Sequence, residues 1–164
     1  MPNSLRVVFD VNVFIDALVG RRSTFPVIEE LPPTSGNWAA DCISLAFDGA
    51  DFQLYCSPHI INNMARVFRA HMGLSDNFVA ISVEAVSDIV HQSGGSILEP
   101  KRHTTESKDF EDNLILDLMI AVNADVLVTN DQGLLNMTPW HGRLIMHPQQ
   151  FVERVVRART RKSI

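Results

Sequence analysis

Two short apolar runs in the chain each end on an acidic residue. Residues 5–9 lead directly into Asp10, and residues 126–129 run through Asn130 to Asp131. A short continuous apolar run is typical of a strand that is buried on both faces of a parallel sheet. Because parallel strands end at the same edge, we expect both carboxylates at the carboxyl edge of one sheet, where open α/β sheets bind ligands.

Strand-like runs alternate with stretches of helical periodicity along the rest of the chain. The pattern predicts helices over residues 12–19, 38–48, 58–71, 77–91, 109–122 and 148–157. It predicts strands over residues 5–10, 52–56, 96–98, 124–130 and 144–146, the last of them at an edge. Prolines predict a loop over 21–36 with one helical turn near 27–31, and polar residues predict another loop over 101–108. This alternation predicts a three-layer α/β/α fold on a mainly parallel sheet.

Length and charge constrain the class of protein further. We expect one domain over residues 1–164, with a basic C-terminal tail at 154–164 on a chain whose formal net charge is −5. The tail could hold phosphates or simply lie in solvent. The two cysteines lack the spacing of a zinc site, and no apolar run approaches the roughly 20 residues of a membrane span. We therefore expect a cytoplasmic protein without membrane contact.

A third group of acids occurs at the start of the helix over 109–122. Its members are Asp109, Glu111, Asp112 and Asp117. Carboxylates that converge raise one another's pKa unless a cation neutralises them, and hard oxygen ligands suit Mg²⁺ or Mn²⁺. We therefore predict a Mg²⁺ or Mn²⁺ site with Asp10 and Asp131 as ligands and Asp112 as a ligand or as the holder of a bound water.

Structural roles remain open for the same acids. Asp10 could be a helix cap, and Asp131 could belong to turn chemistry with Asn130 and a nearby glycine. Asp109 suits the N-cap of its helix, and Asp117 could be a buried structural acid.

Four motifs occur in order between Val7 and about Phe151. They are VVFDVNVFIDAL, CSPHIINNMARVF, SKDFEDNLILDLMIAVNADVLVTNDQGLL and IMHPQQFV. Together they resemble the PIN-domain ribonucleases, a family that includes the VapC-type toxins of bacterial toxin–antitoxin pairs. The most specific part of the resemblance is the acidic helix followed by a strand that ends in VTND.

The resemblance implies a PIN-like fold and an endoribonuclease that hydrolyses RNA phosphodiesters with Mg²⁺ or Mn²⁺. By position, Asp10 matches the first invariant acid, Asp112 the acid that opens the helix, and Asp131 the acid after the fourth strand. Asn12 and Thr129 match polar positions that flank the metal site. The resemblance also implies a 5′-phosphate product, a homodimer and a cognate antitoxin protein as partner.

One position departs from the family pattern. The family has a glutamate in the helix that follows the serine, and counting from Ser57 this position is Asn63. A neutral amide predicts fewer negative charges, weaker metal affinity and occupancy by a single ion. Alternatively Asp109, Glu111 or Asp117 replaces the missing charge, and Asp117 is favoured because its helical neighbours are apolar.

Two further interpretations compete with the enzyme. The first is a PIN-like RNA-binding or partner-binding module whose catalysis has weakened at Asn63. The second is a phosphohydrolase of the haloacid dehalogenase type, but that family has a second aspartate where this chain has Asn12. RNA contact could come from four arginines, which could equally face water: Arg66, Arg69, Arg154 and Arg157.

Overall fold

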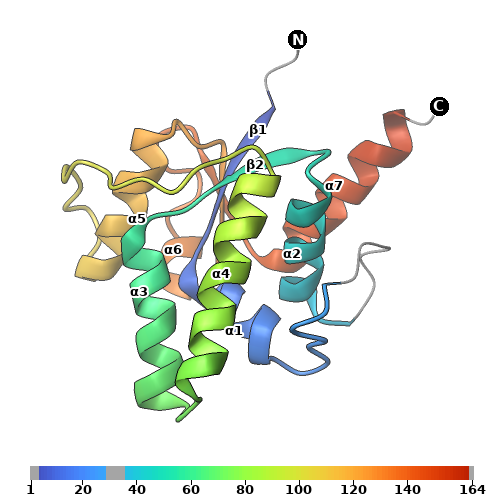
Figure 1. Cartoon of the computed structure of the whole chain (residues 1–164). Helices are drawn as coiled ribbons and strands as arrows, with labels where there is room; N and C mark the ends of the chain where they lie inside the picture. Colours follow the sequence, from blue (N-terminus) through green and yellow to red (C-terminus); the bar gives the residue numbers. More distant parts are fainter. Residues whose placement is uncertain (1–3, 29–35, 163–164) are drawn as a thin grey trace.

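The computed structural model describes residues 4–28 and 36–162. Within these residues the strands form one four-stranded parallel sheet in the order β2-β1-β3-β4. The elements in chain order are β1 (Leu5–Phe9), α1 (Val11–Val19), α2 (Trp38–Asp48), β2 (Phe52–Tyr55), α3 (Pro58–Arg66), a π-helical turn (Val67–His71), α4 (Asp76–Gln92), α5 (Phe110–Ala121), β3 (Val126–Val128), α6 (Gln132–Leu135), β4 (Leu144–Met146) and α7 (Pro148–Lys162). Figure 1 shows α5 and α6 on one side of β1 and α2 and α7 on the other. The predicted α/β fold with a parallel sheet between helices is confirmed.

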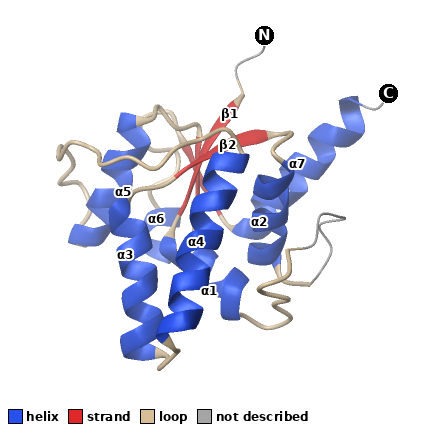
Figure 2. Ribbon diagram, viewed as in Figure 1, coloured by secondary structure: helices blue, strands red, loops and turns tan. Residues whose placement is uncertain are grey.

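Short strands lie at the centre of the fold and helices surround them, as the colouring of Figure 2 makes clear. Phe9, at the end of β1, is fully buried and packs against Phe14 of α1, Phe52 of β2 and Phe151 of α7. The ring centroids of Phe9 lie 5.9 Å from each of the other three. This aromatic cluster joins two strands to two helices at the residue before Asp10. It therefore fixes the position of the Asp10 backbone at the end of β1.

Capping residues set the helix starts that the sequence predicts. Ser57 accepts a hydrogen bond from the backbone N–H of Ile60 and is followed by Pro58 at the first position of α3. Ser75 caps α4 in the same way by accepting from the N–H of Phe78. The edge position of β4 is also confirmed, since β4 pairs only with β3 in the sheet.

Several predicted bounds are wrong, and each error has a local cause. Residues 96–98 form a single bridge from Ile97 to Cys56 rather than a strand, because the Gly94–Gly95 turn and Pro100 leave no room for a ladder. The strand expected over 124–130 is shorter, since the polar residues after Val128 turn away to start α6. α7 continues to Lys162, so residues 154–162 of the predicted basic tail are helical.

Part of the predicted loop over 21–36 lies outside the described residues. The helical turn expected near 27–31 falls mostly within the undescribed residues 29–35. Among the described residues, no helix is both long enough and apolar enough to cross a membrane.

We predict that Phe9→Ala lowers the free energy of unfolding by about 3–5 kcal/mol, because it empties the centre of the aromatic cluster. Urea denaturation measures this change. Phe110→Ala is the matched control, since the Phe110 side chain is 58% exposed, and we expect it to cost less than about 1 kcal/mol. Equal losses in the two variants would contradict the assigned core.

Candidate active site

The register of β1 and β3 places Asp10 beside Thr129. Phe9 pairs with Val128, and the backbone N–H of Asp10 donates to the carbonyl of Val128 at 2.9 Å. Consequently the Thr129 hydroxyl donates to Asp10 Oδ2 at 2.7 Å. Asn12, one residue into α1, donates from Nδ2 to the same Asp10 oxygen at 3.2 Å and to Thr129 Oγ1 at 3.3 Å. The Asp10 carboxylate is therefore held by an alcohol and an amide at the carboxyl edge of the sheet.

Asp131 is joined to this network through its backbone. Its N–H donates to Thr129 Oγ1 at 2.9 Å. Its carboxylate Oδ1 accepts from the N–H groups of Gly133 at 2.7 Å and Leu134 at 3.2 Å, which makes it the N-cap of α6. The alternative role of Asp131 in a turn is thus correct as a description of local structure, and it still places the carboxylate at the sheet edge.

Asp112 comes from the first turn of α5 and is held by the preceding loop. Ser107 Oγ donates to Asp112 Oδ2 at 3.4 Å. Asn113 fixes Ser107 by a reciprocal pair, because its Oδ1 accepts from the Ser107 N–H and its Nδ2 donates to the Ser107 carbonyl, both at 2.9 Å. The loop and the start of α5 are therefore tied together by these hydrogen bonds.

The charges of these acids act on one another. Burial raises the pKa of Asp112 to about 6, and the negative charges of Asp131, Asp109 and Asp10 add to the rise. Burial also raises the pKa of Asp10, and Asp131 adds to it, whereas hydrogen bonds from Thr129 and Val11 act in the opposite direction. We refer to Asp10, Asp112 and Asp131 as the acidic edge. The fold gathers these three predicted residues, although they are far apart in the sequence.

The two other predicted acids have structural contacts. Asp109 is the N-cap of α5 and accepts from the N–H of Glu111 at 2.8 Å, while its charge still acts on Asp112. Asp117 is buried and accepts from the N–H groups of His103 and Thr104 at 3.1 and 2.7 Å. Its other oxygen faces Arg102 Nε at 3.6 Å. These contacts of Asp117 are to the loop over 101–108, so the structure does not support it as the replacement for a missing acid at position 63.

Asn63 lies against the start of α5. Its Nδ2 donates to Glu111 Oε2 at 3.2 Å, and its Oδ1 accepts from Arg66. Arg66 also lies 3.7 Å from Glu111 Oε1 as an ion pair. A carboxylate therefore does stand next to position 63, but it comes from Glu111 and it is neutralised in part by Arg66.

The structure separates the other predicted arginines from the acidic edge. Arg69 pairs with Asp76 at 3.2 Å near the far end of α3. Arg154 lines a hollow together with Leu5, Val126 and Leu144, which begin β1, β3 and β4, so it lies toward the opposite edge of the sheet. Arg157 is exposed one turn later on the same helix. Of the four arginines, Arg66 is the one that contacts residues at the start of α5.

A divalent cation such as Mg²⁺ needs oxygen ligands that converge on one point. Within residues 4–28 and 36–162, no group of three or more His, Cys, Asp or Glu side chains is arranged to hold an ion. The acidic edge nevertheless offers hard carboxylate oxygens whose mutual repulsion a cation would relieve. Mg²⁺ commonly uses only one or two carboxylates and keeps several waters, so these residues fit a partly hydrated ion.

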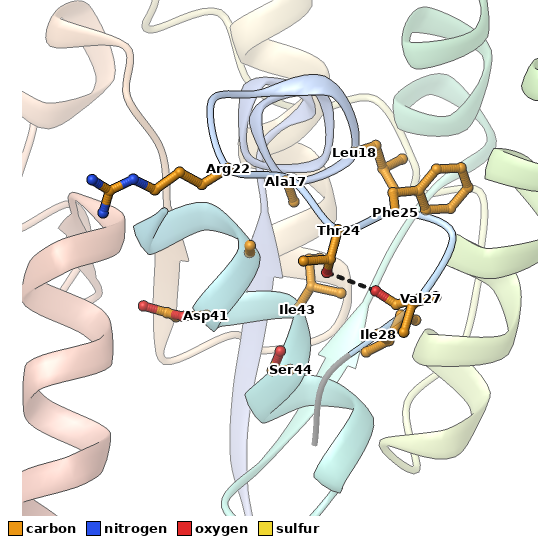
Figure 3. Close-up of a pocket in the computed structure, with 11 residues that line it drawn as sticks. Ala17, Leu18, Arg22, Thr24, Phe25, Val27, Ile28, Asp41, Ile43 and Ser44 are labelled. Atoms are coloured by element: carbon orange, nitrogen blue, oxygen red, sulfur yellow. Dashed lines mark hydrogen bonds between the residues drawn. The ribbon is translucent and has the colours of Figure 1, made fainter. Parts of the chain in front are cut away.

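A separate small hollow lies between α1 and α2 (Figure 3). Its volume is about 40 Å³, and Leu18, Phe25 and Ile43 are among the residues that line it. The labelled side chains of Arg22 and Asp41 point away from it in Figure 3. It can hold little more than a water molecule or two and has no part in the acidic edge.

Sequence reasoning missed Ser107 and Asn113. Asn113 follows directly on Asp112, and Ser107 precedes the N-cap Asp109 by two residues, so helix-start chemistry was the available signal. The reciprocal bonds between them depend on how the loop over 101–108 folds back, and a polar loop without periodicity gives no indication of that path.

The sequence model of the PIN domain matches residues 6–133, which include every residue of the acidic edge. No curated protein matches the chain.

We predict that Asp112→Asn raises Tm at pH 7 in metal-free buffer. The pKa of Asp112 rises from 3.8 to about 6 on folding, so the ionised carboxylate lowers the stability of the folded protein at pH 7. This penalty is absent below pH 3.8, where the carboxyl is protonated in both states, and it develops as the pH rises through about 6. The gain in Tm should therefore disappear near pH 4, which thermal unfolding at several pH values measures. Asp88→Asn, at an exposed position on α4, is the control. A gain that is equal at both pH values would show that the acids do not converge.

Proposed function

Because the chain belongs to the PIN-domain family, whose members are generally nucleases, we propose that it is a metal-dependent endoribonuclease that hydrolyses RNA phosphodiesters. The arrangement that supports this most strongly is the junction of Asp10 and Asp131 through Thr129 at one edge of the sheet. Burial and the charges of Asp131, Asp109 and Asp10 raise the pKa of Asp112 at the same edge. Such a concentration of negative charge would repel a phosphodiester unless a cation reversed its sign.

The residues of the acidic edge would hold Mg²⁺ or Mn²⁺. A divalent cation there would supply charge neutralisation, activation of a water and stabilisation of the leaving oxygen. Asp10 and Asp131 are the proposed ligands, and Asp112 is the proposed third acid, either as a ligand or through a water. Asn12 and Thr129 orient the Asp10 carboxylate by donating to Oδ2, and Thr129 also accepts from the N–H of Asp131. Ser107 orients Asp112 in the same manner.

Asn63 and its neighbours favour a weakened site as the second candidate function. The glutamate that Asn63 replaces would add a charge to the acidic edge, whereas Glu111 stands beside Asn63 and is paired with Arg66. In this second interpretation the chain binds RNA or a protein partner and turns over slowly or not at all. The contact between Asn63 and Glu111 supports Glu111 over Asp109 and Asp117 as the substitute acid in the first interpretation.

The finer part of the proposal concerns biological context. We propose a toxin of the VapC type that acts in the cytoplasm as a homodimer and is restrained by a cognate antitoxin protein. The four motifs that resemble such toxins are the support for this part.

We predict that Asp10→Asn lowers Mg²⁺-dependent cleavage of single-stranded RNA by about a hundredfold or more, because the site loses a charged ligand. The amide oxygen can still accept from the N–H of Val11, and the amide NH₂ can donate to the hydroxyl oxygen of Thr129, so circular dichroism and Tm should show an intact fold. Gel-based cleavage of RNA with and without chelator measures the effect, with Asp88→Asn as the control. Undiminished cleavage by folded Asp10→Asn would overturn the assigned role of Asp10.

We predict that Asn63→Glu raises Mn²⁺ affinity and RNA cleavage by about tenfold or more, because it adds a carboxylate within reach of the start of α5. Titration calorimetry with Mn²⁺ and the same cleavage assay measure the two effects. Asn62→Glu is the control, since it adds the same charge at the adjacent exposed position of α3. If both variants leave metal affinity unchanged, position 63 does not belong to the site.

A further inference from the structure

A hollow of about 290 Å³ lies next to the acidic edge, and the function proposed above gives it no role. Its lining comes from four places in the fold. Asp16 belongs to the end of α1 and Trp38 to the start of α2, while Asn130 follows β3 and His147 follows β4. The hollow therefore opens at the same carboxyl edge as Asp131, which is the residue after Asn130.

Hydrogen bonds connect this hollow to the network around Asp10. Asn12 and Asp16 are four residues apart on α1, so their side chains lie on one face of the helix. The N–H of Asn130 donates to Asn12 Oδ1 at 3.1 Å, and the Asn130 side chain donates from Nδ2 to Asp16 Oδ2 at 2.8 Å. One helical turn, about 5.4 Å, thus separates the group that orients Asp10 from the acid in the hollow.

Hydrogen bonds to backbone carbonyl groups hold the wall of the hollow in place. Asn37 donates from Nδ2 to the carbonyls of Asp16 at 3.0 Å and Arg21 at 3.1 Å, which ties α2 to the end of α1. The N–H of Gly20 donates to the same Asp16 carbonyl at 2.9 Å. A Cβ at Gly20 would stand 2.0 Å from that oxygen, so only glycine permits this approach.

The groups in the hollow suit a planar heterocycle. Asp16 is exposed and presents a carboxylate that Asn130 orients, and a carboxylate can accept two parallel N–H donors. His147 Nδ1 accepts from the N–H of Gln149 at 3.2 Å, which leaves Nε2 as the ring nitrogen that can donate. Trp38 is half-buried and lines the hollow. Aromatic rings are the side chains on which unpaired bases stack.

We propose that this hollow binds an unpaired guanine base of single-stranded RNA, next to the phosphodiester that the acidic edge would cleave. Guanine offers adjacent N1–H and N2–H₂ donors to Asp16 and the O6 acceptor to a donor such as His147 Nε2. Uracil and cytosine present a single donor group on this edge, and adenine presents N6–H₂ beside an acceptor. The inference rests on the proposed RNA substrate and adds a base preference to it.

Mononucleotide binding tests the hollow without any cleavage. The chain has two tryptophans, so in Trp140→Phe the fluorescence reports Trp38 alone. We expect GMP to quench this fluorescence saturably and to bind about tenfold or more tightly than UMP or AMP. Introducing Asp16→Asn into this protein should remove the preference, and introducing Asp88→Asn should leave it unchanged.

Cleavage mapping on single-stranded RNA gives the second readout. We expect the wild-type protein to cut next to guanines and Asp16→Asn to cut with that preference lost. Quenching that is equal for all bases, or a GMP preference that survives Asp16→Asn, would overturn the guanine site. If no RNA is cut but GMP binding still depends on Asp16, the proposed nuclease function fails and the base site stands. If RNA is cut without any guanine preference, the base site fails alone.

Discussion

The pairing of β1 with β3 is the constraint on which the rest of the site depends. Because Phe9 and Val128 are opposite one another in parallel strands, the next residues, Asp10 and Thr129, must emerge side by side. A buried carboxylate is costly unless hydrogen bonds satisfy it, and the Thr129 hydroxyl and Asn12 amide meet that need. The aromatic cluster around Phe9 fixes the end of β1 on the core side of Asp10. Packing in the core and orientation of the buried Asp10 carboxylate are thus parts of one arrangement.

The loop over 101–108 completes the site from the other side. Asp117 holds its first part through the N–H groups of His103 and Thr104. Glu106 holds its second part by accepting from Trp140 Nε1 at 2.7 Å and lying 2.8 Å from His141 Nε2. Between these two anchors and α5, Ser107 is fixed by Asn113. The loop that holds Asp112 through Ser107 is therefore tied both to α5 and to the turn before β4.

The sequence was sufficient for the elements with strong local signals. The bounds of α2 were predicted correctly from helical spacing, and Ser57 with Pro58 marked the start of α3. The α/β class followed from the alternation of elements, and the convergence of Asp10 with Asp131 followed from the way parallel strands end. These inferences needed only periodicity, capping chemistry and the geometry of a parallel sheet.

Contacts between distant segments could not be predicted from local pattern. The buried position of Asp117 was anticipated, but its partners lie in a polar loop without periodicity. Likewise the bond from Asn130 to Asp16 spans 114 residues, and the extension of α7 includes Arg159, which pairs with Asp48 and Asp51.

We propose above all that folding gathers Asp10, Asp112 and Asp131 around a cation. A crystal structure of the protein soaked in Mn²⁺, with anomalous scattering data, tests it most directly. We expect an anomalous peak among these three carboxylates. A structure with Mn²⁺ bound elsewhere, or with no peak there, would contradict this cation site.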